Sequence, residues 1–259
     1  MVKFLLSILL LFSFATLTGQ QTLPYLESKV NDIYKDIEKD QTENLFKLYS
    51  SRIDPSYELI NGRGYFPYYF RSELKPMLFL GKNHTSSVTL DGRKFVDLYL
   101  DYDTFTEEVI YTDSSRICIY TPLRVALNKD NVDCFEFYDG IDSMIFRYFS
   151  KDTDQSFDIK DGYYEVVSER KSKYLIKHNS ILKKIPGIDE YIYVRTGYVD
   201  VGRGFSKIST RKKFIRIFGN RAGEVRKFIE DSGIKIRKAN KQQIMSVLNY
   251  YDNLRNPDN

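Results

Sequence analysis

The stretch VTLDGRKFVDLYL, residues 88–100, decides the fold class. Its centre is Asp91-Gly92, a dipeptide that favours the positive φ angles of a two-residue hairpin turn. Beyond the turn the pattern alternates, with one face made of Val96, Leu98 and Leu100 and the other of Asp97, Tyr99 and Asp101. Such alternation is typical of a strand with one buried face. The stretch therefore predicts an antiparallel hairpin in a half-buried sheet.

Short apolar runs separated by turn signals continue on both sides of this hairpin, from residue 57 to residue 210. They predict further strands at Glu108–Thr112, Arg116–Tyr120, Val132–Tyr138, Ser143–Phe149, Tyr163–Glu169, Lys173–Lys177, Glu190–Tyr198 and Phe205–Thr210. Because the connections are mostly short, they favour an antiparallel meander over parallel strand–helix–strand units.

After Thr210 the apolar period changes to that of a helix. One apolar stripe ends at Gly219-Asn220 and a second ends at Ser232-Gly233, both typical helix stops. Asn240 is a suitable N-cap for a last helix that carries Ile244 and Leu248.

Together these patterns predict an α+β protein that is mainly β. We expect an antiparallel β-meander, as a curved sheet or a sandwich, over residues 56–210, followed by a small basic helical unit over 211–259. Residues 20–55 are polar, with weak helical periodicity, and are predicted to be helical or irregular.

The first 19 residues, MVKFLLSILLLFSFATLTG, have the order of a secretory signal peptide: one Lys, an apolar run, then small and polar residues. The apolar run is shorter than the ~20 residues that span a bilayer as a helix. Gln20 stands where a lipoprotein would carry its processed Cys. We therefore expect an exported protein, periplasmic or extracellular, that is not a lipoprotein and has no transmembrane segment in its mature chain.

Composition favours a globular, sheet-rich chain. The 259 residues include 21 Tyr and 18 Phe but no Trp. Tyr and Phe favour pleated, half-buried surfaces, although they also form stacking surfaces for sugars.

Charge is unevenly distributed along the chain. Residues 203–259 hold 14 Lys and Arg against 5 Asp and Glu, whereas residues 20–202 are acidic by about six charges. This basic region is either a solvated helical face or a weak contact site for anionic membranes, and export argues against nucleic acid as its partner. The candidate contact residues are Arg211, Lys212, Lys213, Arg226, Lys227, Arg237 and Lys238.

The two cysteines, Cys118 and Cys134, both lie in apolar runs. In an oxidising compartment they can pair, and closing that loop would stabilise the fold by about 3 kcal/mol. Alternatively, both are buried free thiols.

Candidate catalytic and metal-binding residues are few. His84 and His178 lie in no metal-ligand spacing, and no G-x-S-x-G motif nominates a serine nucleophile. A spatial Ser-His-Asp arrangement stays open, because its members need not be close in sequence. Gly62-Arg63-Gly64 and Gly202-Arg203-Gly204 lack the remaining spacing of a phosphate-binding loop, so we interpret them as turns or bulges.

Two acidic clusters could supply oxygen ligands for calcium, but solvated turns are the better explanation of both. The first contains Asp101, Asp103, Glu107 and Glu108, and the second contains Asp152, Asp154, Asp158 and Asp161. The second departs from the EF-hand pattern, since Phe157 stands at the glycine position. The sequence therefore indicates no metal and no cofactor.

Three segments, NGRGYFPYYF, DGRKFVDLYLDYDTFTEEVIYTD and the tail KKFIRIFGNRAGEVRKFIEDSGIKI…MSVLNYYDNL, resemble a group of exported proteins of the Bacteroidetes. The resemblance covers residues 57–254 and consists of turns and apolar strands. It implies an envelope or secreted location and a β-rich body, but no activity.

These observations support three hypotheses of function. The first is a non-catalytic envelope or secreted protein that acts through a binding or assembly surface. The second is a carrier that holds a lipid or other apolar ligand in a curved sheet. The third is a hydrolase of envelope polymers that uses Asp and Glu, which would need two carboxylates about 5–10 Å apart in a cleft.

Overall fold

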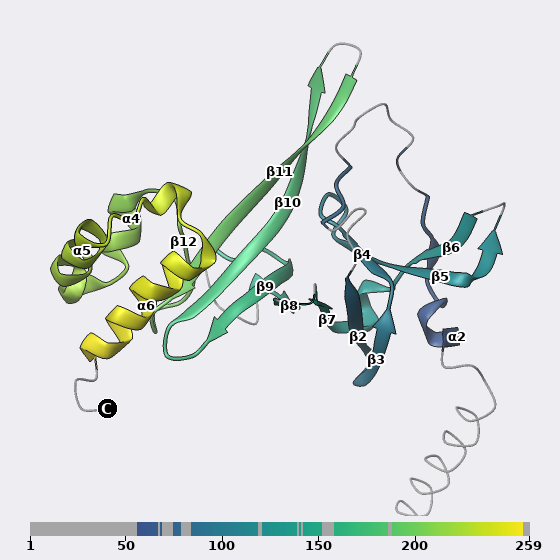
Figure 1. Cartoon of the computed structure of the whole chain (residues 1–259), viewed down its shortest axis with the longest axis horizontal. Coiled ribbons are helices and arrows are strands. Elements are labelled where there is room, and N and C mark those ends of the chain that lie inside the picture. The colour runs from purple at the N-terminus through teal and green to yellow at the C-terminus, as the bar shows by residue number, and fades with distance from the viewer. Residues whose placement is uncertain are drawn as a thin grey trace, which may run out of the picture. The chain divides into compact units, whose positions relative to one another are not determined.

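The computed structural model describes residues 56–66, 68, 75–78, 84–118, 121–138, 140, 142–151, 158–185 and 188–255 (Figure 1). The predicted signal peptide, the segment 20–55, and Asp152 and Asp154 lie outside the described residues. The chain divides into two compact units, Met1–Glu58 and Leu59–Asn259, and the second unit contains both sheets and the C-terminal helices.

The described strands form two antiparallel sheets, which confirms the mainly β, antiparallel fold class. The smaller sheet has the order β1-β6-β5-β4. Its strands are β1 (Arg63–Gly64), β4 (Leu100–Asp103), β5 (Glu108–Cys118) and β6 (Thr121–Ala126).

The larger sheet has the order β12-β11-β10-β9-β8-β7-β2-β3, so it is a meander from β7 to β12 with one hairpin added at the β7 edge (Figure 1). Its strands are β2 (Thr85–Leu90), β3 (Arg93–Leu98), β7 (Val132–Tyr138), β8 (Ser143–Phe149), β9 (Gly162–Glu169), β10 (Lys173–Ile185), β11 (Ile188–Asp200) and β12 (Ser206–Lys207). Every pairing in both sheets is antiparallel.

The hairpin of β2 and β3 turns at Asp91 and Gly92, whose φ angles are 47° and 78°. The predicted turn is therefore confirmed, because both residues occupy the left-handed region that such a turn requires. The predicted alternation beyond it is wrong. Asp97 also has a positive φ, of 55°, and the register with β2 shifts there, so the strand ends at Leu98 and the chain passes into the smaller sheet.

The helices at the C-terminus are α4 (Arg211–Arg216), α5 (Ala222–Asp231) and α6 (Lys241–Arg255), with short 3₁₀ turns η2 (Gly219–Arg221) and η3 (Ile236–Lys238) between them. The Thr210 hydroxyl accepts a hydrogen bond from the Lys213 N–H, and the Asn240 side chain accepts one from the Gln243 N–H. These caps begin α4 and α6 where the sequence predicts helices. Two further short elements are α2 (Ser56–Leu59) and η1 (Lys129–Asn131).

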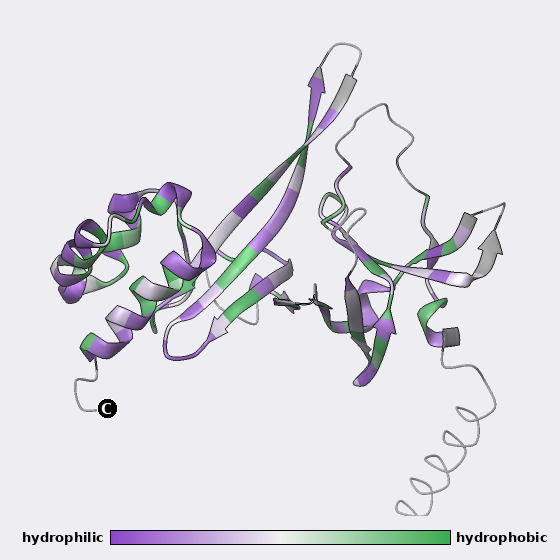
Figure 2. Ribbon diagram, viewed as in Figure 1, coloured by the Kyte–Doolittle hydropathy of each residue, from purple (hydrophilic) through white to green (hydrophobic). Residues whose placement is uncertain are grey.

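One face of the larger sheet contributes to two separate hydrophobic cores. The first, which we call the aromatic core, joins strands β2, β7 and β8 to the smaller sheet and contains Tyr102, Phe135 and Phe146. The second, the helical core, joins β10 and β11 to α4–α6 and contains Ile176, Val199 and Val247. Hydrophilic and hydrophobic residues alternate along β10 and around the helices, as each core requires (Figure 2).

Candidate functional site

A row of residues across four neighbouring strands connects the two cores. Phe135 of β7 stands opposite Phe146 of β8, Phe146 opposite Glu165 of β9, and Glu165 opposite Ile176 of β10. Residues directly opposite one another share a face of the sheet. A carboxylate therefore lies in the middle of an otherwise apolar row, and Glu165 is only 2% exposed.

Glu165 is bonded to a buried histidine. His178 lies two residues beyond Ile176 on β10, and therefore on the same face of the sheet. Its Nε2 is 2.7 Å from Glu165 Oε2, and its Nδ1 is hydrogen-bonded to the Tyr193 hydroxyl of β11. The imidazole is thus held at both nitrogens.

The other oxygen of Glu165 accepts a hydrogen bond from the ammonium of Lys241, the first residue of α6. Because Asn240 caps this helix, Lys241 is fixed at the point where α6 begins. Tyr193, His178, Glu165 and Lys241 form one continuous chain of hydrogen bonds, which we call the seam network because it lies between the two cores.

Burial and pairing set the charges of the seam network. Burial lowers the pKa of His178 below its ordinary value, although the hydrogen bond and charge of Glu165 oppose the shift. Burial acts to raise the pKa of Glu165, but the hydrogen bonds and charges of His178 and Lys241 outweigh it and leave that pKa lowered. The network therefore holds a neutral imidazole and an ionised carboxylate at pH 7.

These charges fix the direction of the hydrogen bonds. An ionised carboxylate only accepts, so the Nε2–H of His178 donates to Glu165, and His178 Nδ1 accepts the Tyr193 O–H. Half of the Tyr193 side chain is exposed, and burial around the rest raises its pKa to about 12. Its hydroxyl therefore stays protonated at neutral pH.

A wall facing the seam network is built from the turn after β4. The buried carboxylate of Asp103 accepts hydrogen bonds from the hydroxyls of Tyr65 and Tyr68 and from the N–H groups of Phe105 and Thr106. These bonds hold the turn in place.

Hydrogen bonds from this turn reach both the segment 75–78 and strand β10. The Thr104 hydroxyl donates to the Pro76 carbonyl at 2.8 Å and lies 2.7 Å from the Ser180 hydroxyl of β10. The Ser180 N–H donates to the Thr104 carbonyl at 3.0 Å. As a result, residues 75–78 are held opposite β10 and β11.

The space between this wall and the seam network is a cavity of about 460 Å³, which we call the seam pocket. It is lined by Lys75, Pro76, Met77, Leu78, Thr104, Met144, His178, Ser180, Tyr191, Tyr193, Arg195 and Lys241. Its walls are largely apolar, and its charged lining residues are three cations. In the part of the chain that the structure describes, no ion pair is formed by Lys75 or Arg195.

The structure separates the two histidines of the sequence. His178 lies in the seam pocket, whereas His84 Nε2 lies 2.6 Å from the Leu100 carbonyl oxygen and the His84 ring packs edge-on against Phe137. His84 and His178 therefore belong to different environments.

The first acidic cluster is dispersed into separate pairs. Asp101 is paired with Arg124, Glu107 with Lys177 and Glu108 with Arg63, at 2.6–2.9 Å. In the second cluster, Asp158 and Asp161 each accept a backbone N–H, from Lys207 and Lys151 respectively. Among the described residues, no group of three or more His, Cys, Asp or Glu is placed to hold a metal ion.

Cys134 is a free thiol in this structure, and its Sγ donates to the Thr89 hydroxyl at 3.4 Å. Cys118 ends β5 of the smaller sheet, and its side chain lies outside the described residues. Pairing of the two cysteines stays a prediction.

The seven basic residues predicted to contact anionic surfaces are all exposed, but they are spread over three helical elements. Arg211 is paired with Glu230, and Lys213 lines a second pocket, near α4. No helix among the described residues is both long and apolar enough to cross a membrane.

The sequence prediction missed Glu165, Tyr193, Arg195 and Lys241 as site residues. One signal for Glu165 existed, because it alternates with Tyr163 and Val167 and so belongs to the inward face of its strand. A charged residue at such a position is unusual unless it is paired.

Comparison with known proteins gives no assignment: no protein-family model, no curated protein and no solved structure matches this chain. The functional argument therefore rests on the chemistry of the site.

Proposed function

We propose that this chain is an exported, non-catalytic binding protein of the cell envelope or the secreted fraction. Its ligand, in this proposal, is a small amphipathic acid, an apolar body with one carboxylate, held in the seam pocket. The observation that carries the proposal is the combination of apolar walls with two cations, Lys75 and Arg195, that form no ion pair within the described residues.

The charge of the seam pocket favours an anion. Glu165 is sealed beneath the surface and already bonded to His178 and Lys241, so it offers a ligand little negative charge. Lys75 and Arg195 both line the pocket and are at least partly exposed. An Arg guanidinium binds a carboxylate through two parallel N–H donors, so Arg195 is the proposed anchor.

The walls favour an apolar body. Met77, Leu78 and Met144 line the pocket, and Met side chains adapt to ligands of irregular shape. A volume of about 460 Å³ lies within the range of small-molecule sites. A purely ionic ligand would leave these apolar walls in contact with water. A ligand with an apolar body would instead cover them, which is favourable because apolar surface is removed from water.

Three features of the site favour binding over catalysis. The raised pKa of Tyr193 keeps its hydroxyl protonated, which disfavours it as a nucleophile. The neutral His178 is held on both sides by protein partners. The described lining of this pocket presents no pair of carboxylates of the kind a glycosidase requires.

The same proposal includes three further points. They are export, the resemblance to exported proteins of the Bacteroidetes, and a weak contact of the basic helical unit with anionic membranes. The leader sequence supports the first. The exposure of all seven basic residues supports the third. Cell fractionation with N-terminal sequencing tests export, with a mature start at Gln20 or Gln21 expected. Sedimentation with anionic and neutral vesicles at low salt tests the contact, and equal recovery with both would contradict it.

Titration calorimetry with a medium-chain fatty acid and with the alcohol of the same chain length tests the ligand class. We expect the acid to bind at least about tenfold more tightly, because only the acid engages Arg195. Arg195→Ala should remove that preference. Arg170→Ala, which removes an exposed arginine outside both pockets, should keep it. Equal affinity for acid and alcohol would overturn the proposal.

A further inference from the structure

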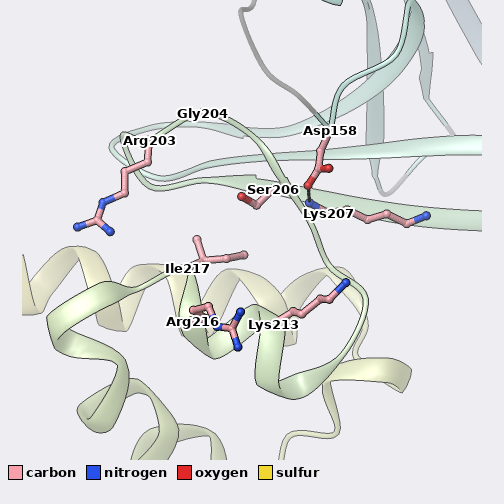
Figure 3. Close-up of a pocket in the computed structure, with 8 residues that line it drawn as sticks. All are labelled: Asp158, Arg203, Gly204, Ser206, Lys207, Lys213, Arg216 and Ile217. Atoms are coloured by element: carbon pink, nitrogen blue, oxygen red, sulfur yellow. Dashed lines mark hydrogen bonds between the residues drawn. The ribbon is translucent and has the colours of Figure 1, made fainter.

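A second pocket lies where the loop between β11 and β12 faces α4 (Figure 3). It has a volume of about 320 Å³, and polar and charged side chains line most of it. Its lining residues are Asp158, Arg203, Gly204, Ser206, Lys207, Lys213, Arg216 and Ile217. We call it the basic pocket, because four of the eight carry a positive charge and one a negative charge.

The loop that forms one side of the basic pocket is fixed by a single carboxylate. Asp200 Oδ1 accepts hydrogen bonds from the N–H groups of Gly202, Arg203 and Gly204, at 2.7–2.9 Å. Gly202 and Gly204 have φ angles of 93° and 86°, which a residue with a side chain rarely adopts. The backbone that presents Arg203 is therefore held in one conformation.

The opposite side is fixed by α4. Lys213 and Arg216 of this helix, and the partly buried Ile217 that follows it, lie on the side of the basic pocket across from Ser206 and Lys207 (Figure 3). The Thr210 cap and the buried Phe214 hold the helix against the sheet. The two sides thus bring basic residues together from positions that are distant in the sequence.

Asp158 is the only acid among the described residues that line the basic pocket. Among the described residues, no ion pair is formed by Arg203, Lys207, Lys213 or Arg216. The one carboxylate, that of Asp158, accepts a hydrogen bond from the Lys207 backbone N–H at 2.9 Å. The positive charges of Lys213 and Arg216, on one side of the cavity, favour an anion within it.

We propose that the basic pocket binds a phosphate monoester group. Such a group carries up to two negative charges and several acceptor oxygens, which Arg216 can bind through paired N–H donors. Lys213 on the same helix supplies further positive charge, and the Ser206 hydroxyl supplies a neutral donor. The side chains of Arg203 and Lys207 extend outward at the two ends of the pocket (Figure 3). This site is separate from the seam pocket and takes a different chemical class.

The test uses the mature chain and glycerol phosphate as the soluble probe, with binding followed by calorimetry. We expect saturable binding that the double variant K213A/R216A weakens at least about tenfold. The matched control is R170A/K235A, which removes two exposed basic residues that line neither pocket. This control should bind as the unmodified chain does, and equal loss in both variants would overturn the proposal, since it would show non-specific attraction.

Lipid headgroups are a second source of the same chemistry, and a vesicle arm distinguishes them. Phosphatidylcholine vesicles are doped with phosphatidic acid, a monoester, or with an equal charge of phosphatidylglycerol, a diester. Binding of glycerol phosphate with a preference for phosphatidic acid supports the pocket and adds a lipid source. Glycerol phosphate binding without that preference supports a soluble source. Equal binding to both vesicles without binding of glycerol phosphate contradicts it.

Discussion

The seam pocket and the basic pocket are both cationic, yet they are built in opposite ways. In the seam pocket, a buried carboxylate holds one lysine in place and the remaining walls are largely apolar. In the basic pocket, cations surround a polar cavity, and the single carboxylate bonds to a backbone N–H. The first arrangement selects a ligand by its apolar body as well as its charge. The second selects mainly by charge.

The origin of this difference lies in where each pocket stands on the sheet. The seam pocket lies beside two hydrophobic cores, so burying Glu165 and His178 there without hydrogen bonds would be costly. The basic pocket lies between a surface loop and α4, where water solvates the charges. The position of a charged residue relative to the cores therefore decides how much it contributes to the free energy of unfolding.

The largest effect should follow from Glu165→Gln. The substitution removes the carboxylate charge that pairs with Lys241 and accepts the hydrogen bond of His178. Removing one partner of a buried ion pair lowers the unfolding free energy by about 3 kcal/mol. The matched control is Glu169→Gln on the same strand, whose pair with Arg147 is about half exposed and is worth less than about 1 kcal/mol. Urea denaturation measures both. Similar losses of unfolding free energy in the two variants would contradict the distinction between buried and exposed charges.

Stability should also depend on pH through His178. Its pKa is lowered in the folded chain, so the unfolded chain binds more protons below about pH 6.5 and the unfolding free energy falls as the pH drops. Glu165 acts with the same sign at lower pH, because its folded pKa lies below 4.5. We therefore expect the unfolding free energy to fall between pH 7 and pH 5 through His178, and urea denaturation at both pH values measures the fall.

The control for this prediction is His178→Gln, which keeps hydrogen-bonding groups but does not titrate. Its unfolding free energy should fall less steeply over the same pH range. An unchanged slope would show that His178 does not carry the dependence.

Salt should weaken ligand binding more in the basic pocket than in the seam pocket, and this effect is smaller than those above. Exposed charges are screened within about 10 Å at 0.1 M salt and about 3 Å at 1 M. Phosphate binding in the basic pocket should therefore weaken about tenfold over this range, whereas binding of a fatty acid in the seam pocket should weaken less than about threefold. Calorimetry in a sodium chloride series measures both, and parallel losses would argue against the apolar contribution to the seam pocket.

The smallest effect is expected for Tyr102→Phe in the aromatic core. The Tyr102 hydroxyl is buried and has no hydrogen-bond partner within the described part of the chain, unlike the bonded polar groups of the seam network. Removing it should leave the unfolding free energy unchanged or raise it by up to about 1 kcal/mol. A clear fall in the unfolding free energy would mean that the hydroxyl is bonded in the folded protein.

Local signals in the sequence predicted much of the fold. Asp91-Gly92 specified its hairpin because the dipeptide alone favours the required backbone angles. The strands β7 and β8 have the predicted bounds, and Asn240 caps α6 as expected. Each of these features depends on residues that are close together in the chain.

Features that depend on distant residues were missed. Strand β6 contains Pro122 and no alternating pattern, and only its pairing with β5 and β1 reveals it. The predicted strands Glu108–Thr112 and Arg116–Tyr120 are largely one strand, β5, whose register shifts after Asp113. Likewise, Glu165 meets its partners 13 and 76 positions along the chain, a separation that no local pattern encodes.

Methionine methyl NMR tests the central claim, that the seam pocket binds an amphipathic acid, most directly. Met77 and Met144 line the seam pocket, whereas Met245 packs against the helical core and serves as an internal control. With a medium-chain fatty acid added to saturation, we expect the methyl signals of Met77 and Met144 to shift and that of Met245 to stay in place. Saturable binding that leaves Met77 and Met144 unchanged, or that moves Met245 alone, would contradict the account.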